Sequence, residues 1–227
     1  DGQTTLEPAS LRLMVVGWSR RVLVLIEQLL ESGFQSVDIT LVSRISIEDR
    51  ENALRWKSFY PDRLTINHIE ADLKAPGVIE HLEFDGVNSV LLLASRGSKS
   101  AEESDARTIV SYELLVSALE EKFRSAETVP RITAEMAHVT SMLQFPRSSD
   151  LVLIRPRILG YLQSHVVLKR ELNSVFSALF NPGKHAIISI RDISAYRGSP
   201  GVDLAFAEVE ERATERGEVA LGLLVNK

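Results

Sequence analysis

Short, almost wholly apolar runs of strand length alternate with helical patterns through much of the chain. Leu11–Val16 (LRLMVV) and Val90–Ala94 (VLLLA) carry hydrophobic residues at neighbouring positions, without the apolar and polar alternation of a half-exposed strand. Such runs are typical of a parallel sheet that helices cover on both faces. Strands alternating with helices also imply right-handed crossover connections. The sequence therefore predicts an α/β fold with a Rossmann-like, doubly wound parallel sheet.

The spacing of apolar residues places the individual elements. Within Arg20–Glu31, apolar residues recur at steps of 3, 1, 3 and 1, which is the pattern of one helical face, and Ser32-Gly33 ends the helix. The other segments follow by the same reasoning. The expected strands are 11–16, 37–42, 64–69, 89–94 and 131–134, and the expected helices are 20–31, 47–57, 76–82 and 101–124.

The composition changes after Phe145–Ser149, where a second part of the molecule is expected. A short strand at 151–154 precedes an unusually long helical pattern, Arg157–Phe180, which Asn181-Pro182-Gly183 ends. A strand at 186–190, a helix at 204–216 and a strand at 219–225 follow. The expected organisation is a lead-in at 1–10, a Rossmann-like lobe at 11–146, a crossover strand and long helix at 147–182, and a small α+β lobe at 183–227.

The charge balance and residue counts argue against several classes of function. A net charge of -5, without long blocks of one sign, argues against nucleic acid as a partner. The absence of cysteine removes disulfides, thiolate metal ligands and a cysteine nucleophile. No stretch reaches the roughly 18 apolar residues of a membrane span, so we expect a soluble, cytoplasmic polypeptide. Because it begins with Asp1 and a polar lead-in, we expect a segment of a longer protein.

The turn after the first expected strand is where a doubly wound sheet receives a dinucleotide, because helix amides and the helix dipole favour a phosphate there. The fingerprint for that ligand is G-x-G-x-x-G. The sequence here is Gly17-Trp18-Ser19-Arg20-Arg21-Val22, which keeps the first glycine alone. The second strand ends Val42-Ser43-Arg44 and lacks the acidic residue that holds a ribose. A turn that needs Gly17 only for its backbone is the favoured interpretation.

An anion pocket is the alternative interpretation of the same turn. Arg20, Arg21 and Arg44 are expected near the helix start, where guanidinium groups bind phosphate in a bidentate manner; a solvated helix face is the simpler explanation of the same residues. The cofactor stays open between a nucleotide such as NAD or ATP and Ca²⁺. If a ligand binds, the residues expected to contact it follow the first, second and fourth strands: Gly17, Trp18, Ser19, Arg20, Ser43, Arg44, Ala94, Ser95 and Arg96.

Signatures of catalysis and of metal binding are missing from the sequence. The 5 histidines form no His-x-x-x-His pair, and neither a G-x-S-x-G turn nor a P-loop occurs. Acidic clusters at 102–105 and 208–211 lack the spacing of a calcium loop and are interpreted as charged helix faces. Ser104 or Asp105 is expected to cap the helix at 101–124. We therefore expect neither a catalytic residue nor a metal ligand, and no enzyme.

The long helical pattern Arg157–Phe180 has more apolar residues than a simple connection needs. Leu159, Val166, Val175 and Phe176 are among them. Surplus apolar surface on a long helix that links two lobes is expected to pack against a second copy of the chain. The sequence therefore predicts a homo-oligomer.

Several of these segments together resemble a known family. Val15–Arg20 at the first strand, Ser104–Thr108 at the long helix and Ile158–Tyr161 in the connecting helix resemble RCK (regulator of K⁺ conductance) domains, which are related to the TrkA-N type of uptake regulator. The likeness is strongest to the Castor/Pollux type of ion channel. Asp203–Gly222 resembles the C-terminal lobe of the second RCK domain in those channels. The order and spacing of the segments carry the likeness over nearly the whole chain.

This resemblance implies a regulatory domain of a cation or potassium channel or transporter. In the family, paired RCK domains form a gating ring beneath a pore, and a ligand or ion shifts the ring between states by favouring one of them. The implied partners are a membrane pore domain of the same or a partner chain, and further copies in a dimer within a tetramer or octameric ring. The implied place is the cytoplasmic face of a membrane. The alternatives are an NAD(P)-binding oxidoreductase and a free-standing dimerisation or ligand-binding module.

Overall fold

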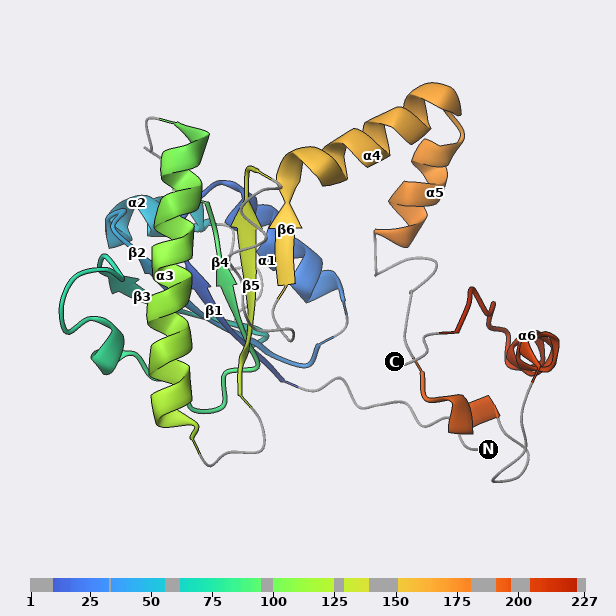
Figure 1. Ribbon diagram of the computed structural model, residues 1–227, viewed down its shortest axis with the longest axis horizontal. Coiled ribbons are helices and arrows are strands. Elements are labelled where there is room, and N and C mark those ends of the chain that lie inside the picture. The colour runs from blue at the N-terminus through green and yellow to red at the C-terminus, as the bar shows by residue number, and fades with distance from the viewer. Residues whose placement is uncertain are drawn as a thin grey trace. The chain divides into compact units, whose positions relative to one another are not determined.

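Six parallel strands form one sheet in the order β3-β2-β1-β4-β5-β6 (Figure 1). Each strand is in parallel register with its neighbours, for example Val15 opposite Leu41 on one side and Leu91 on the other. This order, which reverses direction between β1 and β4, is that of a doubly wound sheet. The predicted fold class is confirmed. The strands are β1 (Leu11–Val16), β2 (Val37–Ser43), β3 (Leu64–Glu70), β4 (Ser89–Leu92), β5 (Arg131–Met136) and β6 (Leu151–Ile154).

The chain divides into two units, Asp1–Ala186 and Ile187–Lys227, in the computed structural model. The residues that the structure describes are 10–32, 34–55, 62–94, 100–124, 129–138, 151–180, 191–196 and 205–223. The first unit holds the sheet with helices α1 (Arg21–Glu31), α2 (Ile47–Ala53), α3 (Ala101–Lys122), α4 (Arg155–Leu168) and α5 (Leu172–Leu179), and the 3₁₀ turn η2 (Ile79–His81). The second holds the 3₁₀ turn η4 (Ile193–Tyr196) and helix α6 (Phe206–Glu215).

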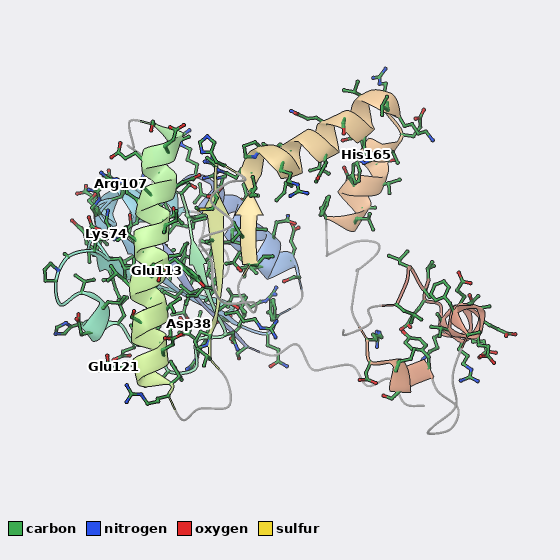
Figure 2. All side chains as sticks on the ribbon, viewed as in Figure 1. Asp38, Lys74, Arg107, Glu113, Glu121 and His165 are labelled. Atoms are coloured by element: carbon green, nitrogen blue, oxygen red, sulfur yellow. The ribbon has the colours of Figure 1, made fainter. Side chains whose placement is uncertain are left out.

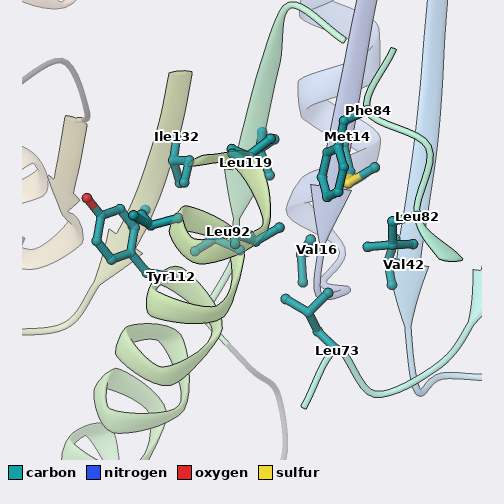
Figure 3. Packing of buried hydrophobic residues seen from close by; sticks show 14 residues of the cluster. Met14, Val16, Val42, Leu73, Leu82, Phe84, Leu92, Tyr112, Leu119 and Ile132 are labelled. Atoms are coloured by element: carbon teal, nitrogen blue, oxygen red, sulfur yellow. The ribbon is translucent and has the colours of Figure 1, made fainter. Parts of the chain in front are cut away.

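Residues 13–16 of β1 are buried on both faces of the sheet, which is why this part of the strand is a continuous apolar run. Val15 points to one face and packs in a cluster with Ile26 of α1. Met14 points to the other face and belongs to a cluster with Tyr112 and Leu119 of α3, which Figure 3 shows from close by. Successive strand residues point to opposite faces of a sheet. The two clusters are therefore separate cores, one on each side of the sheet.

Helix α3 buries one face and exposes the other. Its buried side includes Tyr112, Leu115 and Leu119, while Glu113 and Glu121 are exposed on the helix (Figure 2). Ser100 is the N-cap of the helix, and its side chain accepts a hydrogen bond from the amide of Glu103 at 3.2 Å. The expectation that Ser104 or Asp105 caps this helix is wrong, because both lie inside it and are buried.

The long helix expected at 157–180 is interrupted, and the expectation of one continuous helix is wrong. Helix α4 begins earlier, at Arg155, with a proline in its first turn. It ends at Leu168, the C-cap residue Lys169 has an extended backbone (φ -144, ψ 99), and α5 starts at Leu172. Three consecutive charged residues, Lys169-Arg170-Glu171, separate the apolar positions of the two helices. The apolar spacing continues on both sides of this segment, which is why the pattern resembles one helix.

Other elements differ from expectation in extent. Helix α2 ends at Ala53, and the expected helix at 76–82 is the 3₁₀ turn η2. The described part of the strand expected at 219–225, residues 219–223, is not in a strand, and the structure describes no strand of the second unit with which it pairs. The strand expected at 186–190 lies outside the described residues.

The second unit is held together by polar contacts between η4 and the end of α6. Arg212 and Arg216 donate hydrogen bonds to the carbonyl oxygens of Tyr196 and Ala195. The hydroxyl of Tyr196 donates to a carboxylate oxygen of Glu218 at 2.6 Å, which raises the pKa of Tyr196. Val209 and Ala213 of α6 are the buried apolar residues described in this unit. The described part of this unit therefore contains a small apolar core.

A fully buried arginine, Arg50 of α2, joins the ends of β2 and β3. Its Nη1 donates to the carbonyl oxygen of Leu41 at 2.8 Å and its Nη2 to that of Ile69 at 3.3 Å. Desolvation by burial lowers the pKa of Arg50, and the charges of Glu70 and Glu51 oppose this shift. A buried cation that is hydrogen-bonded in this way fixes the helix against the sheet.

We expect Arg50→Met to lower the free energy of unfolding by about 1–3 kcal/mol, because it removes charged hydrogen bonds from a buried site. Urea denaturation followed by circular dichroism measures the change. Arg55→Met is the control, since Arg55 is exposed and donates to the side chain of nearby Asn52. Equal stability of the two variants would contradict this role of Arg50.

Candidate functional site at the carboxyl edge of the sheet

The carboxyl ends of the parallel strands meet along one edge of the sheet, and the strand order reverses there between β1 and β4. In doubly wound folds this switch point is where ligands bind. The sequence-predicted ligand residues Gly17, Ser43 and Ala94 lie directly after β1, at the end of β2 and just after β4. The topology thus brings the three predicted segments to one edge.

Gly17 is required by the geometry of the turn after β1. Its φ is +102°, which side chains disfavour, and its amide donates to the carbonyl oxygen of Val42 at 2.8 Å. A Cβ atom at this position would lie 2.9 Å from the carbonyl oxygen of Leu93, at the end of β4. The glycine lets β1 and β4 approach closely at the switch point. This close approach accounts for the one retained glycine of the fingerprint without a ligand.

The residues that follow Gly17 serve the start of α1. Trp18 is half-buried and packs on the cluster of α1 and the sheet. Ser19 is buried, and its hydroxyl oxygen accepts from the backbone amide and the Nε of Arg21, both at 3.3 Å. Arg20 is exposed, with a helical backbone. Of these side chains, Arg20 is the one placed to meet a ligand from solvent.

The ends of β2 and β3 carry opposite charges. The Nε of Arg44 lies 3.7 Å from a carboxylate oxygen of Asp72, and the Nζ of Lys74 lies 3.8 Å from the other oxygen. Ser43 is buried, and its hydroxyl oxygen accepts from the amide of Ile45 at 3.1 Å. Exposed pairs of this length contribute little to stability. Arg44 is therefore available to an anion that binds more strongly than Asp72 does.

Contacts from several elements at this edge of the sheet converge on one buried carboxylate, Glu135, near the end of β5. Arg21 binds it with two nitrogens, Nη1 to Oε1 at 2.7 Å and Nη2 to Oε2 at 3.0 Å. The Nε of Arg155, the first residue of α4, lies 3.0 Å from Oε1. The backbone amide of Ala94 donates to Oε2 at 3.2 Å. One side chain thus connects α1, β4, β5 and α4.

A second carboxylate, Asp105, fixes the turn after β5. Its oxygens accept from the amides of Ala137 at 2.8 Å and His138 at 2.9 Å, and the Nδ1 of His138 lies 3.2 Å away. The Nε2 of the same ring is 3.6 Å from Glu102. Asp105 lies in α3, so this contact ties the helix to the sheet edge. No group of three histidine or acidic side chains suited to a metal ion is found in the described residues.

Sequence reasoning found part of this edge and missed its centre. Arg21 was expected near an anion, and its partner is a carboxylate of the chain itself. Glu135 and Arg155 were not singled out. The available signal was Glu135 itself, a charged residue between the apolar Ala134 and Met136 near the end of a strand, since buried charges require partners. Ser95 and Arg96 lie outside the described residues, and whether the predicted residues bind a ligand stays a prediction.

Comparison with models of known protein families finds no match, and comparison with curated proteins finds none either. Among solved structures, the human SLO3 gating ring matches 63% of this chain and 24% of its own, with 9% identity and a TM-score of 0.44. Uronate dehydrogenase from Agrobacterium tumefaciens matches 56% of this chain and 40% of its own, with 16% identity and a TM-score of 0.35. The chain thus spans less than half of either structure, and neither likeness carries an argument for function. None of the described helices combines the length and apolar character needed to cross a membrane.

We expect Gly17→Ala to lower the free energy of unfolding by at least about 1 kcal/mol more than Gly77→Ala, because overpacking adds to backbone strain. Gly77 also has a positive φ, +81°, but a Cβ there meets nothing within 4 Å. The difference between the two variants in chemical denaturation isolates the contact with Leu93. Equal destabilisation would show that the close approach at the switch point is unimportant.

Proposed function

We propose that this chain is a regulatory domain of the RCK type, of the Castor/Pollux kind and most similar to its second RCK domain. It acts through changes of shape and assembly beside a cation or potassium pore, which the same chain or a partner chain supplies at the cytoplasmic face of a membrane. The order of the RCK-like segments and the doubly wound sheet support this proposal. Catalysis is not part of it.

The observation that carries the proposal is the exposure of α4 and α5. Neither helix contains a buried residue. Val167 is 81% exposed, Leu168 79% and Phe180 61%. The two helices contact each other through rings, with His165 (Figure 2) edge-on to Phe176 at 6.3 Å between centroids. Exposed apolar surface of this extent is typical of an interface.

A second copy of the chain is the proposed partner for this surface. Helix α5 is strongly amphipathic in sequence, with Leu172, Val175, Phe176 and Leu179 at helical spacing. A helix with such a face is stable in water when it packs against apolar surface. Closed homo-oligomers are the commonest way to provide this surface. A dimer that builds a larger ring is consistent with the proposed regulatory role.

The ionic centre at Glu135 supports coupling between assembly and the sheet edge. Arg155 is the first residue of α4 and lies 3.0 Å from Glu135, which also accepts from the amide of Ala94 at the switch point. A displacement of α4 at an interface would change these contacts first. A ligand at the edge can shift the assembly only if it favours one of the two arrangements.

The alternative function is that of an NAD(P)-binding oxidoreductase, which the sheet topology favours. The turn after β1 argues against it, because Ser19 and Val22 stand where the fingerprint has glycine. An assay of NADH or NADPH oxidation distinguishes the two functions. Oxidation of NADH or NADPH by the pure protein with any substrate, lost on changing one residue at the edge, would overturn the regulatory proposal.

We expect Val167→Asp/Val175→Asp to convert an oligomer into a monomer, because two buried carboxylates would be desolvated at the interface. Native mass spectrometry and light scattering at micromolar concentration measure the state. Gln163→Asp/Ser177→Asp is the matched control, with the same added charge at exposed polar positions of the same helices. A monomeric unaltered chain, or equal dissociation of both variants, would contradict the proposed assembly.

We expect Arg44→Glu to abolish any binding of ATP, AMP, NAD(H) or NADP(H), because it replaces the cation at the end of β2 with an anion. Thermal shift and calorimetry measure binding. Arg131→Glu carries the same charge change at the opposite edge, where β5 begins, and should not alter affinity. Unchanged affinity of Arg44→Glu would discard this role, and no response to any of these nucleotides would discard the nucleotide pocket.

A further inference from the structure

An open groove of about 610 Å³ lies between α1 and the beginning of α4, over the ends of β4 and β6. Its walls are apolar side chains from all four elements, among them Leu25, Leu93, Leu153 and Leu159. A groove of this volume is within the range of small-molecule sites, which are mostly apolar with a few converging polar groups. All the residues that line it are described by the structure.

The polar part of the groove is concentrated in one cluster. Arg21, Glu135 and Arg155 line it and are joined by ion pairs of 2.7 to 3.0 Å, so they stand together. Two guanidinium groups and one carboxylate leave a net charge of +1. The side chains of Arg21 and Arg155 are 47% and 38% exposed, while that of Glu135 is 9% exposed. The groove surface is therefore almost wholly hydrocarbon, with a small polar area that comes from this positively charged cluster.

Arg155 has unused hydrogen-bonding capacity. Its Nε faces Glu135, and its two terminal nitrogens make no hydrogen bond or ion pair within the described part of the chain. A guanidinium group offers these nitrogens as a planar fork that fits a carboxylate. Glu135 is already shared between Arg21, Arg155 and the amide of Ala94. A second carboxylate to which Arg155 could donate hydrogen bonds therefore has to come from outside this cluster.

We propose that this groove binds a long-chain fatty acid, with the carboxylate on Arg155 and the acyl chain along the apolar walls. A single negative charge matches the net charge of the cluster. A cationic amphiphile would be repelled by both arginines, and a neutral chain would cover their nitrogens without a partner. The inference does not require the proposed regulatory function, but Leu159 lies on α4, whose exposed surface is the proposed interface between copies.

Isothermal titration of the full chain with dodecanoate, below its critical micelle concentration, tests the proposal. We expect saturable binding, no binding of dodecyltrimethylammonium, and about tenfold weaker binding of decanoate, which is two methylenes shorter. Arg155→Met should weaken dodecanoate binding by about tenfold or more, since charged hydrogen bonds are lost. Arg157→Met is its control, because Arg157 lies on α4, does not line the groove and contacts Tyr161.

A second pair of variants tests the apolar wall. Leu159→Asp should abolish dodecanoate binding, and Leu168→Asp, at a more exposed leucine of α4 outside the groove, should not. The proposal is overturned if dodecanoate does not bind, if the cationic amphiphile binds as well, or if Leu168→Asp loses binding equally. It is also overturned if Leu159→Asp dissociates an oligomer and dodecanoate fails to bind, because the groove then belongs to an interface between copies.

Discussion

A buried carboxylate needs positive charge and hydrogen-bond donors around it, and at Glu135 this need connects four elements of the fold. Arg21 brings the start of α1 to the sheet edge, and Arg155 brings the start of α4. The amide of Ala94 holds the end of β4. Because Arg21, Ala94 and Arg155 come from distant parts of the sequence, the carboxylate gains its two hydrogen bonds and two ion pairs only when the sheet is assembled in this order.

The apolar pattern was sufficient to predict the sheet, because burial on both faces leaves a strong signal in runs such as Leu11–Val16. The same pattern failed at Lys169-Arg170-Glu171, where three charged residues interrupt a helix without changing the apolar spacing. It also failed at the cap of α3. Ser100, Ser104 and Asp105 are all residue types that favour the N-cap position. Ser100 is the N-cap in the structure, and the carboxylate of Asp105 instead accepts hydrogen bonds from the turn after β5.

The candidate site was predictable in position and only partly in chemistry. Topology places the ends of β1, β2 and β4 together, so Gly17, Ser43 and Ala94 followed from the strand order. The pairing of Arg21 with Glu135 spans 114 positions and leaves no periodic trace in the sequence. Such contacts between single charged residues become visible only when the fold is known.

The break between α4 and α5 affects what this part of the molecule can transmit. A continuous helix over 157–180 would be a rod of about 36 Å, and a rotation at one end would appear undiminished at the other. Two short helices with a break between them transmit such a rotation only when contacts hold both helices in a fixed relative orientation. Transmission of a rotation from α4 to α5 therefore depends on the contacts between the two helices. The aromatic contact between His165 and Phe176 is one of these contacts.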